Sequence, residues 1–120
     1  MNGRNYLFVC SQNKLRSPTA EHIFADRAGI NTLSAGTNND AENPLSDEPV
    51  EWADVIFAME NTHRNKLRKK FRAALKDTRV VVLDIPDDYE FMDDALVRLL
   101  EARMGKWIPC LLYTSPSPRD

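Results

Sequence analysis

The sequence predicts an α/β fold in which a four-stranded parallel sheet is flanked by layers of helices. Short runs rich in valine, isoleucine and phenylalanine alternate along the chain with segments whose apolar residues recur at helical spacing. Strands with few polar residues are typical of parallel sheets that are covered on both faces. In this architecture ligands bind beyond the carboxyl ends of the strands, so residues that directly follow a strand are the first candidates for a site.

Length and composition indicate a single globular domain. The 120 residues are 28% charged and 42% hydrophobic, and the net charge of -2 gives no overall attraction to nucleic acid or to an anionic membrane. No run is long enough to span a bilayer, and the N-terminus does not resemble a signal peptide. Two cysteines are too few for a disulfide framework and lack metal-ligand spacing, so we expect a cytoplasmic protein without metal or cofactor.

The first part of the chain is expected to supply two strands and the helix between them. The apolar run 6–9 predicts the first strand, and 31–35 predicts the second. The spacing of apolar residues predicts a helix over 18–28. Ser17 favours the N-cap of this helix and Pro18 its first position, where the missing N–H costs nothing.

The second part of the chain is expected to continue the alternation. Leu67, Phe71 and Leu75 lie four residues apart and predict a helix with one apolar stripe. The fourth strand is nearly all valine and is followed by an acidic loop, 84–89. The predicted elements are the strands 54–59 and 79–83 and the helices 47–53, 61–76 and 91–104.

The segment from Cys10 to Ser17 lies between the first strand and the first helix and is typical of an oxyanion-binding loop. The five residues between Cys10 and Arg16 let the backbone wrap around a tetrahedral anion with several N–H groups pointing inward. The helix start adds positive partial charge, which favours the nucleophilic thiolate. Arg16 can grip two oxygens of a phosphoryl group, and Ser17 can donate a hydrogen bond to the sulfur. A bare Cys-x5-Arg also fits a buried structural cysteine beside a surface arginine, but the flanking strand and helix favour phosphate chemistry.

Four segments, in order, resemble the low-molecular-weight protein tyrosine phosphatase family, in its short bacterial form. Phe8–Glu21 resembles the phosphate loop of the family, and Ala53–Met59 its third strand. Ser34–Thr37 is similar to a segment beside the site, and Ile85–Tyr89 matches the place of the general-acid loop. The likeness extends over roughly Tyr6 to Arg103. It implies a flavodoxin-like three-layer sandwich of the phosphotyrosine phosphatase I type.

The resemblance implies a phosphomonoester hydrolase that works through a cysteinyl-phosphate intermediate on phosphotyrosine in a phosphoprotein or on a small aryl phosphate. Cys10 would be the nucleophile, Arg16 the phosphate ligand and Asp87 the general acid that protonates the leaving oxygen. Tyr89 would flank the substrate pocket and could stack on an aromatic substrate. The implied phosphate-binding residues are Ser11, Gln12, Asn13, Lys14, Leu15, Arg16 and Ser17.

Three positions depart from the family pattern. Gln12 stands where glycine is usual, Leu15 where many members carry a second cysteine, and Asp88 where proline is usual. The missing proline leaves Asp84, Asp87 and Asp88 as candidates for the general acid, of which Asp87 best fits the family spacing.

Two other functions remain open. An arsenate reductase would use the same loop for another oxyanion, although that chemistry commonly needs further cysteines. A catalytically weak module would bind phosphoproteins through the loop. The basic run Arg64–Arg72 could hold RNA or a phosphorylated partner, but such a run is more often the solvated face of a helix, so we expect neither a nucleic-acid nor a membrane partner. The sequence predicts no oligomeric state.

The domain is expected to cover residues 1–109, with 110–120 as a tail outside it. The tail reads Cys-Leu-Leu-Tyr-Thr-Ser-Pro-Ser-Pro-Arg-Asp, which resembles the translation of an adaptor used in DNA sequencing libraries. We therefore assign no role to the tail.

Overall fold

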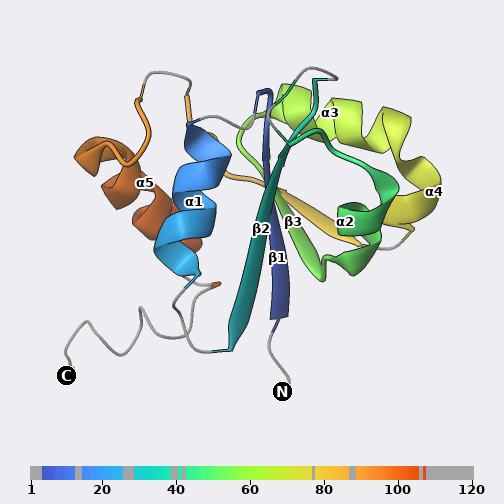
Figure 1. The fold of residues 1–120 in the computed structure, drawn as a ribbon, viewed down its shortest axis with the longest axis horizontal. Helices are drawn as coiled ribbons and strands as arrows, with labels where there is room; N and C mark the ends of the chain where they lie inside the picture. The colour runs from blue at the N-terminus through green and yellow to red at the C-terminus, as the bar shows by residue number, and fades with distance from the viewer. Residues whose placement is uncertain are drawn as a thin grey trace.

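A parallel sheet of four strands forms the middle layer of the protein (Figure 1). The computed structural model describes residues 4–12, 15–25, 29–38, 41, 43–76, 78–86, 89–105 and 107. The strands are β1 (Arg4–Cys10), β2 (Ile30–Gly36), β3 (Val55–Ala58) and β4 (Arg79–Val82). Their order in the sheet is β2-β1-β3-β4, and every pair is parallel, as predicted.

Helices cover both faces of this sheet. They are α1 (Arg16–Phe24), α2 (Asp47–Trp52), α3 (Asn61–Lys70), α4 (Arg72–Leu75) and α5 (Asp94–Met104). Figure 1 shows α1 and α5 on one side of the sheet and α2, α3 and α4 on the other. The predicted three-layer α/β sandwich is therefore confirmed.

The alternation of side chains along β1 divides the core into two layers. Tyr6, Phe8 and Cys10 join the cluster that α1 and α5 cover, whereas Leu7 and Val9 join the cluster that α2, α3 and α4 cover. Successive side chains of a strand point to opposite faces, so this division follows from the strand itself. Full burial of a large apolar side chain stabilises the fold by about 1.5–3 kcal/mol. Cys10 consequently ends β1 on the face that α1 covers.

Several predicted helix boundaries were wrong. The first helix ends at Phe24 instead of residue 28, and the second at Trp52, one residue earlier than predicted. The first helix begins at Arg16 instead of Pro18, and Leu15, not Ser17, occupies its N-cap. The predicted helix 61–76 breaks at Phe71 (φ -122°, ψ 33°), whose half-buried side chain packs against the core layer under α3 and α4. The last helix begins at Asp94, because the Asp93 carboxylate caps it by accepting a hydrogen bond from the Ala95 N–H at 2.9 Å.

Within the described residues, no helix is both long enough and apolar enough to cross a membrane. The described part of the predicted domain 1–109 ends at Trp107. The predicted tail, 110–120, lies outside the described residues.

Candidate active site

The carboxyl ends of the strands bring together the segments that follow β1, β2, β3 and β4. The segment after β2 holds the start of the loop that follows β1, because the Thr37 N–H donates to the Cys10 carbonyl at 2.8 Å and the Asn38 N–H donates to the Ser11 carbonyl at 3.0 Å. After β3, the Met59 N–H donates to the Val9 carbonyl at 3.0 Å. Backbone hydrogen bonds thus fix the position of Cys10 from both neighbouring strands.

The Cys10 thiol lies against the Ser17 hydroxyl. The Sγ–Oγ distance is 2.9 Å, and Cys10 and Ser17 are 3% and 0% exposed. Ser17 lies inside the first turn of α1, so its hydroxyl faces the sulfur instead of capping the helix. A hydroxyl in this position can donate a hydrogen bond to a thiolate, which is the nucleophilic form of cysteine. The structure therefore brings together two of the residues that the sequence placed in the site.

Arg16 is buried beneath the ends of β3 and β4. Its guanidinium Nη1 forms an ion pair with the Glu60 carboxylate and donates to the Ile85 carbonyl at 2.7 Å. The side chain of Arg16 is 4% exposed, whereas that of Glu60 is 39% exposed. These two acceptors fix the plane of the guanidinium, and five N–H donors let Arg16 bind further groups. Sequence reasoning assigned Glu60 no role. The feature that could have indicated one was its position just beyond β3, at the carboxyl edge of the sheet.

His63 joins α3 to the second residue of the loop. The Nδ1 atom of His63 accepts a hydrogen bond from the Glu60 backbone N–H at 3.0 Å, and its Nε2 atom lies 2.9 Å from the Ser11 Oγ. A backbone N–H can only donate, so Nδ1 carries no proton and Nε2 is the protonated nitrogen that donates to Ser11. His63 is buried, with 2% of its surface exposed. Sequence reasoning assigned His63 no role in the site and missed this contact, whose signal was a histidine in the first turn of a helix that begins beyond a central strand.

The remaining loop residues are placed only in part. Gln12 and Leu15 are both half-buried. Asn13 and Lys14, which the sequence also assigned to phosphate binding, lie outside the described residues. Their contribution stays a prediction.

The segment after β4 leads to the predicted acid. The Leu83 N–H and the Ile85 N–H donate to the carbonyls that end β3, at 2.9 and 2.8 Å, while Asp84 between them has a positive φ of 57° and an exposed side chain. Aspartate tolerates this left-handed conformation better than most residues. Asp87 and Asp88 lie outside the described residues.

Tyr89 is half-buried and packs against the core layer that contains Cys10. This places it on the same side of the sheet as the nucleophile, and its role in a substrate pocket stays a prediction. Among the described residues, no group of three or more His, Cys, Asp or Glu side chains is arranged to hold a metal ion.

Comparisons with known proteins give relatives of one kind. No family model matches the chain. A curated relative, the protein-arginine-phosphatase of Bacillus subtilis (strain 168), is 30% identical over 92 residues, and the match covers 54% of this chain and 61% of the relative. The chain thus spans about three fifths of that relative's length.

Two solved structures share the fold. The YwlE arginine phosphatase from Geobacillus stearothermophilus has a TM-score of 0.70 at 21% identity, covering 97% of this chain and 99% of that one. A low-molecular-weight phosphotyrosine phosphatase from Vibrio cholerae O395 has a TM-score of 0.72 at 20% identity, covering 94% of this chain and 99% of that one. These likenesses confirm the fold that the sequence predicted.

Proposed function

We propose that this chain is a member of the low-molecular-weight protein tyrosine phosphatase family and a cysteine-dependent phosphatase that acts on phosphoproteins. The observation that carries the proposal is the contact of 2.9 Å between the Cys10 Sγ and the Ser17 Oγ, at the junction of β1 and α1. This junction provides a nucleophile, a donor to its thiolate and the start of a helix in one place. A cytoplasmic location would suit it, because a working thiolate needs a reducing compartment.

In the first step, the Cys10 thiolate attacks phosphorus. An S–P bond forms while the bond from phosphorus to the leaving oxygen breaks, and the leaving oxygen takes a proton from Asp87. Arg16 stabilises the negative charge on the oxygens in transfer, because a guanidinium offers paired donors in one plane. Arg16 donates a hydrogen bond to the Ile85 carbonyl, two residues before Asp87. This contact brings the start of the segment that carries the Asp87 carboxyl next to Arg16, which supports the assignment of Asp87.

In the second step, water attacks the phosphorus of the cysteinyl-phosphate. The S–P bond breaks, Asp87 takes a proton from the water, and inorganic phosphate leaves with Cys10 again a thiolate. The alternation of one carboxyl between acid and base is why a single aspartate suffices for both steps.

For the substrate we propose phosphotyrosine or a related aryl phosphate, which Tyr89 would stack upon. The name of the curated relative supports a second candidate, phosphoarginine in a protein. Cys10 would then attack the phosphorus of phosphoarginine, and the leaving group would be a guanidine nitrogen of the substrate instead of an oxygen. Both substrates present a phosphoryl group at the end of a long side chain, so both could reach a buried thiol.

Hydrolysis of p-nitrophenyl phosphate by the wild type, Cys10→Ser and Cys110→Ser tests the activity. We expect Cys10→Ser to lose turnover and Cys110→Ser, which serves as the matched control, to keep the turnover of the wild type. Equal activity in all three proteins would overturn the proposed function. Phosphate release from a phosphotyrosine peptide and from a phosphoarginine peptide then separates the two substrates.

The leaving-group dependence of Asp87→Asn tests the acid. We expect phenyl phosphate hydrolysis to fall by about 10²–10⁴-fold, as is typical of general acid catalysis, and p-nitrophenyl phosphate hydrolysis to fall less, because nitrophenolate leaves without a proton. An equal loss on both substrates would contradict the role of Asp87. Asp84→Asn and Asp88→Asn are the controls, and a selective loss in either of them would move the role there.

A further inference from the structure

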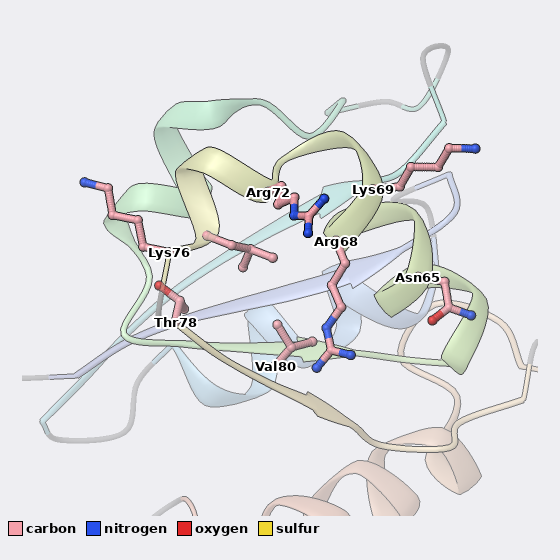
Figure 2. Close-up of a pocket in the computed structure, with 8 residues that line it drawn as sticks. Asn65, Arg68, Lys69, Arg72, Lys76, Thr78 and Val80 are labelled. Carbon is pink, nitrogen blue, oxygen red and sulfur yellow. The ribbon is translucent and has the colours of Figure 1, made fainter.

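A groove on the far side of α3 from the phosphate loop is lined by basic side chains. It has a volume of about 540 Å³ and lies between α3, α4 and β4. Figure 2 shows the Arg68 side chain extending from α3 toward Val80 on β4 and the Arg72 guanidinium near the junction of α3 and α4, with Lys69 and Lys76 pointing outward at the two ends. The aliphatic side chains of Leu75 and Val80 also line the groove.

The charge of this region is unbalanced. The segment from Arg64 to Arg79 contains eight of the 16 lysines and arginines of the chain, and its single acidic residue is Asp77. No described carboxylate forms an ion pair with any of the four basic residues that line the groove. Because like charges repel across a shared cavity, an anionic occupant would lower the electrostatic energy of the groove.

The surroundings of the groove restrict the size of that anion. Helix α2, which packs against α4, carries the exposed residues Asp47, Glu48 and Glu51. These carboxylates would repel a duplex or a long single strand of nucleic acid that extended past the groove toward α2. Single-stranded nucleic acid is usually held by aromatic side chains that stack on its bases, and none of the described residues that line the groove is aromatic. A short anionic segment fits better than a long polyanion.

The edge of the sheet favours an extended peptide. β4 is the last strand in the order β2-β1-β3-β4, so within the described residues its outer edge has no strand partner. An exposed edge offers backbone N–H and C=O groups to an added strand, whose affinity comes from main-chain hydrogen bonds and whose specificity comes from its side chains. Acidic side chains on such a strand would meet Arg68 and Arg72, whose planar groups pair with carboxylates in two-point contacts.

We propose that the groove between α3, α4 and β4 is a docking site for a short, extended, acidic segment of a partner protein. This site is separate from the phosphate loop: no described residue of 10–17 is among its lining residues, and Arg68 lies five residues beyond His63 on α3, which is about 7.5 Å of helix rise. A small phosphate ester at Cys10 therefore does not need the groove.

Fluorescence anisotropy with a labelled oligoglutamate peptide of about ten residues tests the docking site, because this probe carries the extended acidic character alone. We expect the wild type to bind the peptide and Arg68→Glu to weaken binding by at least about tenfold, as for removal of a close charge pair at an interface. Lys70→Glu is the matched control, since Lys70 is an exposed residue of the same helix that does not line the groove. It should weaken binding by less than about threefold, because screened surface charges contribute little.

Two further probes decide the class of partner: an oligouridylate of similar length and vesicles of phosphatidylserine and phosphatidylcholine. Tighter binding of either one than of the peptide would overturn the proposal, and so would equal losses in Arg68→Glu and Lys70→Glu or no binding of the peptide at all. Hydrolysis of p-nitrophenyl phosphate is measured with and without the peptide. Competitive inhibition would place the peptide in the phosphate loop and overturn the docking site, whereas inactivity of the wild type would refute the proposed function and leave the binding test intact.

Discussion

Two substitutions of His63 separate its two hydrogen bonds. An asparagine places an acceptor oxygen where Nδ1 lies, and a glutamine places a donor nitrogen where Nε2 lies. His63→Asn should therefore keep the bond from the Glu60 N–H and lose the one to Ser11, and His63→Gln should do the reverse. Each variant loses one buried hydrogen bond, so we expect the free energy of unfolding to fall by about 1 kcal/mol in both.

The two variants should differ in activity. The bond to Ser11 holds the phosphate loop, and its loss is worth about 1 kcal/mol of positioning, which is roughly fivefold in kcat/KM. We expect this loss in His63→Asn and a value close to the wild type in His63→Gln, measured with p-nitrophenyl phosphate beside urea unfolding of each protein. Equal values of kcat/KM in the two variants would refute the argument and leave His63 with a role in stability alone.

Three further substitutions test other contacts. Ser17→Ala removes the buried hydrogen bond between the Ser17 hydroxyl and the Cys10 sulfur, so kcat and the rate of alkylation by iodoacetamide should each fall by about ten- to a hundredfold, and unchanged rates would argue against the contact. Glu60→Gln removes a negative charge beside Arg16, so inorganic phosphate should inhibit up to about tenfold more strongly, whereas weaker inhibition would show that the charge mainly orients the guanidinium. Burial raises the pKa of Tyr6, although the positive charge of the neighbouring Arg4 acts in the opposite direction. The neutral Tyr6 hydroxyl therefore contributes its full stability below pH about 10, and this contribution is lost as the pH rises through the raised pKa of the folded state. Tyr6→Phe lacks the hydrogen bond to the Trp107 carbonyl, so its free energy of unfolding should be about 1 kcal/mol lower than that of the wild type at neutral pH. In alkali the free energy of unfolding of the variant should fall less than that of the wild type, and an equal fall in the two proteins would contradict this.

The elements that sequence reasoning found are those with a strong local pattern. The four strands are short apolar runs bounded by polar residues, and the contact between Cys10 and Ser17 follows from a loop of fixed length between a strand and a helix. The break of the predicted helix at Phe71 was not predictable in this way, because Leu67, Phe71 and Leu75 continue one stripe across it. Packing of Phe71 against the core overrides the local preference there.

The contacts that sequence reasoning missed join residues far apart in the chain. Arg16 and Glu60 are 44 residues apart, and Ser11 and His63 are 52 apart. Either pair meets only because β1 and β3 are neighbours in the sheet, and the order of strands depends on pairing across the whole domain. A pattern confined to one segment contains no information about such a pair.

The long-range contacts also explain how a loop with an unusual residue can keep its shape. Gln12 stands beside Ser11, whose carbonyl accepts from the Asn38 N–H and whose hydroxyl accepts from His63. The other end of the loop is fixed by Arg16, which is held by groups beyond β3 and β4. These anchors come from separate strand ends of the sheet, so they hold the described ends of the loop, Cys10 and Ser11 on one side and Arg16 on the other, through contacts that need no glycine at position 12. A catalytic loop that is held from outside can accept a side chain at such a position and still present its donors in a fixed arrangement, which is what electrostatic stabilisation of a phosphoryl group requires.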